Sequence, residues 1–108
     1  MRDTMVAKLK GEKEMKKYYI IRAEKAGVFA GNIKERIGQE VTLTNCRRLW
    51  YWDGAASLSQ LAVDGVSKQQ NCKFTVSVDE ITILGAIEII PCTKKAEDCI
   101  KAVSVWKA

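Results

Sequence analysis

The chain is expected to change from strand to helix within one stretch, Arg47-Arg48-Leu49-Trp50-Tyr51-Trp52-Asp53-Gly54-Ala55-Ala56-Ser57-Leu58-Ser59-Gln60-Leu61-Ala62. Two arginines and three aromatic residues occupy its first part, and small residues begin the second. Alternate side chains of a strand share a face, so Arg48, Trp50 and Trp52 are expected on one face. Arg47 and Tyr51 are expected on the other. Cations and aromatic rings therefore meet where the sheet gives way to a helix.

A short helix is predicted from Ala55 to Val63, directly after this strand, with its apolar residues on one face. Asp53 is suited to cap its N-terminus, because a carboxylate accepts backbone N–H bonds there. Gly65 suits the left-handed conformation that ends a helix. The small residues after Gly54 would let a ligand approach the free N–H groups of the first turn.

The rest of the chain has mainly strand character. One irregularity in the strands is expected at an asparagine and another at a glycine. Runs rich in β-branched and aromatic residues predict strands at 17–23, 28–33, 40–52, 74–78, 81–84 and 86–90, with an edge strand at 103–106. Asn45 is expected to bend the third strand, and Gly85 to form a bulge. A second short helix is predicted at 94–102, with Thr93 as its N-cap.

These segments predict an α+β fold. The connections are too short for several parallel crossovers, which favours a mainly antiparallel β-sheet of about six to seven strands with two short helices. A chain of 108 residues is long enough for one domain, which we expect over residues 17–108. Residues 1–16 are expected to form a basic N-terminal arm.

The formal net charge of +5 is unevenly distributed. Residues 1–25 hold eight Lys and Arg against four Asp and Glu, whereas residues 73–108 hold five of each. Acidic residues interspersed in the basic segment dilute its attraction for phosphate, so a solvated face or an arm is favoured over a nucleic-acid groove. Nucleic acid is accordingly an unlikely partner.

Histidine is absent, and the four cysteines show no Cys-x-x-Cys spacing. The absence of histidine removes the Ser/His and Cys/His nucleophile arrangements, and isolated cysteines are more typical of buried packing than of zinc or redox sites. We therefore expect no enzyme, no cofactor and no metal. No apolar run approaches the roughly 20 residues of a membrane span, and the first residues do not resemble a signal peptide. A cytoplasmic protein without a membrane partner is expected.

Two interpretations of the central stretch remain open. In a purely structural one, Trp50 and Trp52 fill the core, Asp53 caps the helix, and both arginines lie at the surface. In the other, arginines and aromatic rings form a binding site, because guanidinium groups hold phosphate and aromatic faces hold bases.

The stretch from Arg47 to Ala62 resembles the central motif of a small uncharacterised protein family encoded by tailed bacteriophages and prophages. Residues 26–31, 87–93 and 103–108 carry the same resemblance, which covers roughly residues 18–108 and leaves the N-terminal arm outside. The resemblance implies a phage origin and action in the cytoplasm of an infected bacterium. It implies no catalytic or binding residues.

The leading hypothesis is a non-enzymatic, homo-oligomeric counter-defence protein that sequesters a cyclic or linear nucleotide immune signal. Its expected ligand-binding residues are Arg47, Arg48, Trp50, Tyr51, Trp52, Gly54, Ser57, Ser59 and Gln60. The arginines would pair with phosphate, the aromatic residues would stack on bases, and the polar side chains would select among them. The alternatives are a protein-interaction module that inhibits a host protein, and a nucleic-acid-binding accessory protein.

Overall fold

A hairpin and a long third strand form the centre of the sheet. In the computed structural model, which describes residues 17–107, β1 (Tyr19–Ala23) pairs with β2 (Gly27–Ile37), and β2 pairs with β3 (Glu40–Tyr51). All of these pairings are antiparallel. Asn45 adopts a left-handed conformation with φ 49° where the β2–β3 register shifts, which confirms the predicted irregularity. The predicted N-terminal arm lies outside the described residues.

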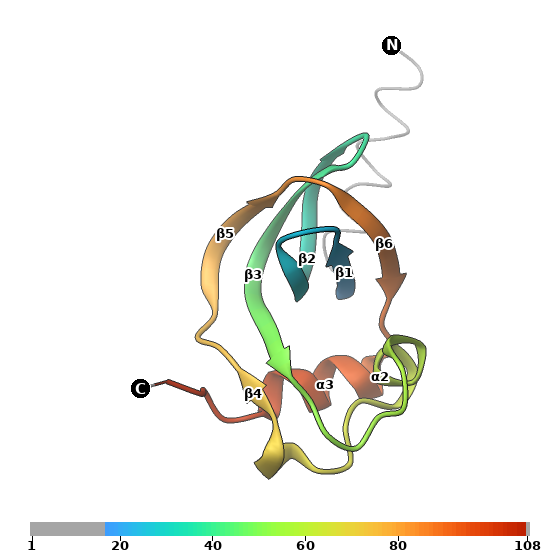
Figure 1. Cartoon of the computed structure of the whole chain (residues 1–108), viewed down its shortest axis with the longest axis vertical. Helices are drawn as coiled ribbons and strands as arrows, with labels where there is room; N and C mark the ends of the chain where they lie inside the picture. Colours follow the sequence, from blue (N-terminus) through green and yellow to red (C-terminus); the bar gives the residue numbers. More distant parts are fainter. Residues whose placement is uncertain (1–16, 108) are drawn as a thin grey trace.

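The sheet coils on itself because its two edges are joined by a very short link. The order is β4-β3-β2-β1-β6, where β4 is Lys73–Phe74 and β6 is Ala86–Pro91. β5 (Val78–Ile83) pairs with the first half of β3, and β4 pairs with its end. Only Leu84 and Gly85 separate β5 from β6, although β6 pairs with β1 at the opposite edge. Figure 1 shows the resulting open barrel, with the β5–β6 link passing across one end.

This closure corrects three sequence predictions. Gly85, with φ 74°, lies in the link between the two edges and is not a bulge. The predicted strand 74–78 is broken, because residues 75–77 carry the chain from β4 to β5. The predicted edge strand 103–106 is reduced to a single parallel bridge between Phe74 and Val105. The sequence pattern predicted where the chain favours β-structure. It did not show which edge of the sheet each segment joins.

Two hydrophobic clusters lie on opposite faces of the sheet. One fills the barrel and includes Ile21, Phe29 and Leu43. The other lies between the outer face of the sheet and the helices, and includes Ile20 and Ile100. β1 is buried on both faces because successive side chains of a strand point to opposite sides.

The outer cluster is covered by two short helices, α2 (Leu58–Asp64) and α3 (Lys94–Ala102), with the 3-10 turn η1 (Gln69–Asn71) between them in sequence. Thr93 caps α3 through its side chain, as predicted, and Gly65 ends α2 with φ 77°. None of the helices in the described part of the chain is long and apolar enough to cross a membrane.

The start of α2 differs from the prediction. It begins at Leu58 rather than Ala55, and Ser57 is the N-cap. Asp53 instead accepts a hydrogen bond from the Asn71 side chain at 2.9 Å. The prediction was wrong because Asp53 and Ser57 can both accept N–H bonds at a helix start. The packing of the loop, which the sequence pattern does not show, decides which of them caps α2. With six antiparallel strands and two α-helices within residues 17–107, the predicted α+β fold is confirmed.

Candidate ligand-binding site

Arg47 is an internal cross-link. It is 3 % exposed, and its guanidinium donates to the carbonyl oxygens of Phe74, Thr75, Ile100 and Val103 at 2.9–3.0 Å. Burial lowers the pKa of this guanidinium from its ordinary value. The predictions that Arg47 lies at the surface, or that it contacts phosphate, do not fit this environment, because its donors are already engaged.

Arg48 lies on the opposite face of β3, at the open end of the barrel. It is paired in register with Phe29 of β2, and its Cζ atom lies 4.5 Å from the centre of the Phe29 ring. One of its terminal nitrogens donates to the carbonyl oxygen of Ala26. The guanidinium is therefore held in place by a ring and a carbonyl while remaining partly exposed.

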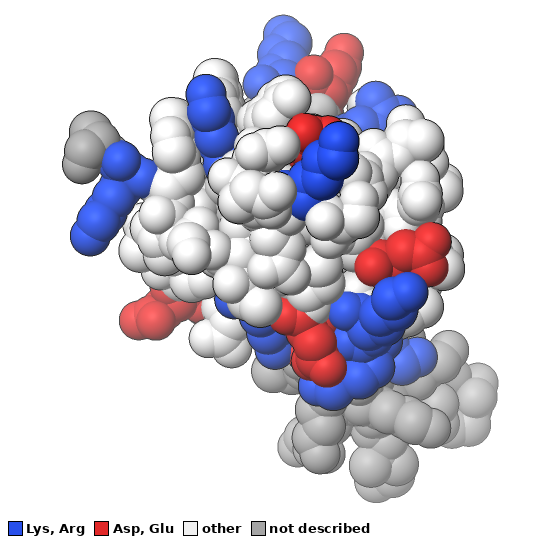
Figure 2. Space-filling view, turned by 90° about the horizontal axis from the view of Figure 1, so that it is seen from below, with Lys and Arg blue, Asp and Glu red and all other residues white. Residues whose placement is uncertain are grey.

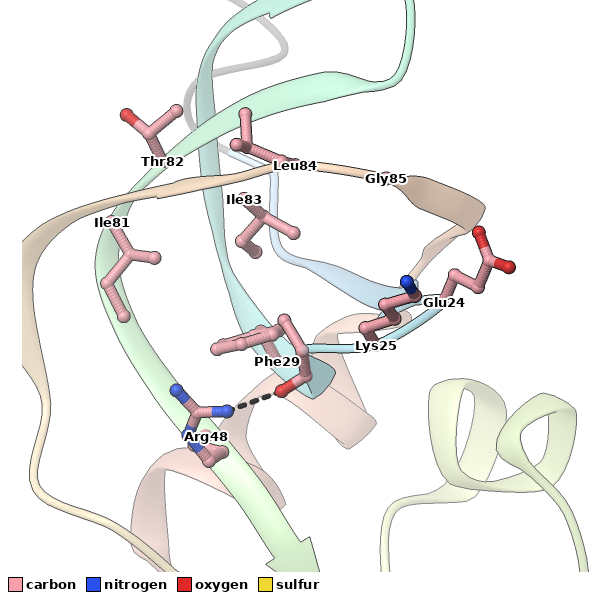
Figure 3. A pocket seen from close by; sticks show the side chains of 10 residues that line it. Glu24, Lys25, Phe29, Arg48, Ile81, Thr82, Ile83, Leu84 and Gly85 are labelled. Carbon is pink, nitrogen blue, oxygen red and sulfur yellow. Dashed lines mark hydrogen bonds between the residues drawn. The ribbon is translucent and has the colours of Figure 1, made fainter.

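Two cavities meet at Arg48. The first, which we call the barrel-mouth cavity, has a volume of about 570 Å³ and lies beside the β5–β6 link. Its lining residues are Glu24, Lys25, Ala26, Phe29, Arg48, Ile81, Thr82, Ile83, Leu84 and Gly85. In Figure 3, Arg48 lies at one end of this cavity, Lys25 and Glu24 lie toward the other, and the β5 side chains lie across from Phe29.

The second cavity, which we call the indole cleft, has a volume of about 300 Å³. Arg48, Trp50 and Trp52 line it together, as the alternation of a strand predicts, and residues 26–28 form its other side. Trp50 is 63 % exposed, which rules it out as a core residue. Trp52 is half-buried against the outer cluster, so the structural interpretation holds for Trp52 only in part.

A third tryptophan extends this aromatic surface. The rings of Trp50 and Trp106 are parallel to within 6°, with their centres 6.4 Å apart. The Lys73 ammonium lies 5.5 Å from the Trp106 ring centre. Trp106 is 44 % exposed, so the pair is open to solvent. Tyr51 points to the other face of β3 and is exposed, so the structure does not bring it to the indole cleft.

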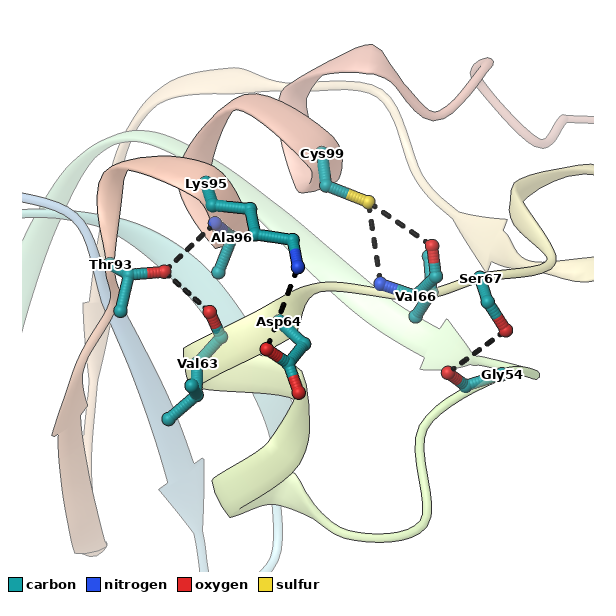
Figure 4. Close-up of polar contacts among 9 residues, drawn as sticks. All are labelled: Gly54, Val63, Asp64, Val66, Ser67, Thr93, Lys95, Ala96 and Cys99. Atoms are coloured by element: carbon teal, nitrogen blue, oxygen red, sulfur yellow. Dashed lines mark hydrogen bonds and ion pairs between the residues drawn. The ribbon is translucent and has the colours of Figure 1, made fainter.

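The other predicted site residues lie around the start of α2. Gly54 and Gln60 line a separate cavity of about 470 Å³ between α2 and α3. Figure 4 shows Gly54 with Asp64, Lys95 and Cys99, which also line this cavity. The Ser57 hydroxyl accepts the Gln60 N–H at 3.1 Å, and Gln60 Oε1 accepts the Ala56 N–H at 2.8 Å. Ser59 is exposed. The polar groups of this helix start are therefore used within the chain, and the predicted site separates into two regions.

Gly54 has a structural explanation. Its φ is +97°, and a Cβ atom at this position would lie 2.6 Å from the backbone nitrogens of Ser67 and Lys68. The Gly54 carbonyl accepts hydrogen bonds from the Ser67 backbone and hydroxyl (Figure 4). Only glycine permits this close approach between two loops.

Sequence reasoning missed the residues that surround Arg48 from other strands. Phe29 and Lys25 come from the first hairpin, and Ile81 and Leu84 come from β5 and the link that follows. Their patterns are those of ordinary strand and turn residues. Only the closure of the sheet brings them together, so no local signal identifies them.

All four cysteines are free thiols. Burial raises the pKa of Cys46 and of Cys92 to about 12, which keeps both thiols protonated at neutral pH. Among residues 17–107, no group of three His, Cys, Asp or Glu side chains is close enough to hold a metal ion. Protonation makes the Cys46 and Cys92 thiols poor nucleophiles.

Comparison with known proteins gives one match. The model of a family described as a domain of unknown function (DUF6948) matches residues 16–100, which are most of the chain. No curated protein and no solved structure matches this chain.

Proposed function

Because this chain belongs to the DUF6948 family, whose function is unknown, we propose a role from its geometry: a non-enzymatic protein that binds a nucleotide at Arg48. The ligand's phosphate would pair with the Arg48 guanidinium, and its base would lie in the indole cleft. The coarser prediction, an uncharacterised family, is confirmed by the match.

The position of Arg48 is the observation that carries this proposal. It is an arginine that lines two cavities and is oriented by two neighbours, Phe29 and Ala26. A guanidinium fixed in this way loses little freedom when it binds an anion, and its remaining N–H groups match the spacing of phosphate oxygens.

The indole cleft supports the second half of the proposal. Trp50 and Trp52 follow Arg48 at the spacing of alternate strand residues, so a base could contact indole while its phosphate reaches the cation. Stacking of a base on an aromatic side chain is worth about 1–3 kcal/mol. Arg47 and the helix start are not part of this site, because their polar groups are engaged elsewhere.

A sequestering role in infected bacteria is part of the proposal. The resemblance to phage and prophage proteins supports it. A protein that binds a host signal without converting it needs affinity and abundance but no catalytic group.

Calorimetry with purified full-length protein tests the proposal. We expect AMP, GMP and cyclic dinucleotides to include at least one binder, and Arg48→Gln to weaken its binding roughly 10- to 100-fold. Arg36→Gln removes the same charge from an exposed position that lines neither cavity and should change the affinity less than twofold. The absence of both heat and thermal shift with every nucleotide would overturn the proposal.

The exposed Trp50–Trp106 pair favours a second candidate, a protein-interaction module. Aromatic residues open to solvent are enriched at protein interfaces. A stoichiometric protein partner that is lost with Trp106→Ala and retained with Arg48→Gln would support this role instead. Recovery of no such partner at low salt would count against it.

Nucleic acid is less well supported as a partner. The Lys94, Lys95 and Lys101 side chains of α3 each form an ion pair with a carboxylate. Figure 2 shows cations and anions interspersed over the face seen from below, with uncharged surface between them. A groove that follows a phosphate backbone needs a continuous positive surface, and this face does not provide one.

A further inference from the structure

The barrel-mouth cavity has no role in binding a mononucleotide through the indole cleft. Arg48 and Ala26 line both cavities, so the two spaces adjoin on either side of the hydrogen bond between these residues. A ligand with one base and a phosphate at Arg48 can fill one cavity and must leave the other empty.

The lining of the barrel-mouth cavity suits a flat ring with an anionic group beyond it. Phe29, Ile81, Ile83 and Leu84 provide apolar walls, which favour the faces of a ring over water. Lys25 supplies a second cation at the end of the cavity away from Arg48, as Figure 3 shows. Glu24 lies at the same end as Lys25, so the cavity combines apolar walls with two cations and one carboxylate.

The volumes of the two cavities are consistent with one ring system in each. Small-molecule sites have volumes of roughly 300–1,000 Å³. The indole cleft is about 300 Å³ and the barrel-mouth cavity is about 570 Å³. Each cavity is large enough for one ring system, and the guanidinium between them is placed to meet a linking phosphate.

We propose that the ligand is a dinucleotide, with its linking phosphate at Arg48, one base in the indole cleft and the other in the barrel-mouth cavity. This inference rests on the function proposed above. It adds that the two halves of the ligand occupy different cavities and that Lys25 meets a second phosphate when the ligand carries one.

The test compares three probes of the same base in calorimetry with full-length protein: AMP, the linear dinucleotide pApA and cyclic di-AMP. The guanine series GMP, pGpG and cyclic di-GMP is measured in parallel. We expect a dinucleotide to bind at least 10-fold more tightly than its mononucleotide, because a second ring and its contacts are added without a second loss of translational freedom.

Variants in the barrel-mouth cavity locate the second base. Leu84 is 68 % exposed and Lys25 is exposed, so Leu84→Ala and Lys25→Ala should fold. Each should reduce the ratio of mononucleotide to dinucleotide Kd at least threefold. Ile37→Ala removes an equally exposed apolar side chain that lines neither cavity, and should leave this ratio unchanged.

The outcomes separate this inference from the function it rests on. If mononucleotide and dinucleotide bind equally well through Arg48, the dinucleotide inference is overturned and the proposed function stands. A tighter dinucleotide whose advantage survives both cavity variants also overturns the inference, because the second base then lies elsewhere. If no nucleotide binds, both are overturned.

Discussion

Adjacent arginines in this chain have opposite environments, because consecutive residues of a strand face opposite sides of the sheet. Arg47 points into the cluster beneath the helices and connects β4 with the C-terminal end of α3 through four carbonyl oxygens. Arg48 points into the barrel mouth and lies against Phe29. The same residue type is thus a buried cross-link at one position and lines two cavities at the next.

Replacing Arg47 should destabilise the fold strongly. Arg47→Met removes four hydrogen bonds to carbonyl oxygens, and we expect a loss of about 3–5 kcal/mol in the free energy of unfolding. Arg47→Lys should recover only part of it, since one ammonium cannot reproduce the planar set of donors. Urea denaturation followed by circular dichroism measures both variants.

Arg48→Gln is the matched control, because it removes the neighbouring guanidinium from a partly exposed position. We expect it to cost about 1 kcal/mol or less. Equal destabilisation by the Arg47 and Arg48 variants would contradict the separate roles assigned to them.

At the scale of the element, α2 shows how a loop sets the start of a helix. The Ser57 hydroxyl accepts the Gln60 N–H, and the Gln60 side chain reaches back to the Ala56 N–H. This reciprocal arrangement satisfies two donors at the N-terminus of the helix. A ligand approaching there would have to displace both.

Ser57→Ala should destabilise the protein by about 1 kcal/mol, because the cap hydrogen bond is lost. Ser59→Ala, two residues later and exposed, should change stability by less than about 0.5 kcal/mol. Thermal denaturation of the two variants beside the natural chain measures the difference. A larger effect at Ser59 than at Ser57 would show that the cap is assigned incorrectly.

Sequence patterns predicted the elements better than their connections. The first two strands, the bend at Asn45 and the capping of α3 by Thr93 all depend on neighbouring residues, and all are confirmed. The break after Phe74 and the role of Gly85 depend on which distant edge accepts each strand. A local pattern carries no information about that choice.

The same distinction applies to the candidate site. Alternation along β3 predicted that Arg48, Trp50 and Trp52 share a face, and they line one cleft. The burial of Arg47 was not predicted, because its partners come from residues 74–103. Trp106 was likewise not placed beside Trp50, since the contact joins two segments more than 50 residues apart.

For the molecule as a whole, buried acidic groups predict a stability that falls at high pH. Burial raises the pKa of Cys46 and Cys92 to about 12, from an ordinary value of 9.0, and also raises the pKa of Tyr18. The folded chain therefore keeps protons that the unfolded chain releases above pH 9. The stabilisation is complete below that pH and is lost as pH rises toward 12.

We expect the urea midpoint to be nearly constant between pH 7 and 8.5 and to fall between pH 9 and 11.5. Cys92→Ala should make this fall shallower, because one of the groups with a raised pKa is removed. Denaturation curves at fixed ionic strength measure the effect. A midpoint that rises through this range would contradict the assigned direction of the shifts.

The position of β1 between the two hydrophobic clusters has a consequence for how the protein opens. Ile20 packs toward the helices and Ile21 into the barrel, so neither cluster can be exposed without disturbing this strand. The two clusters should then melt in one cooperative transition, with the barrel and the helical layer as a single unit. Amide hydrogen exchange should be slowest at residues 20 and 21, at a rate set by global unfolding rather than by local fraying.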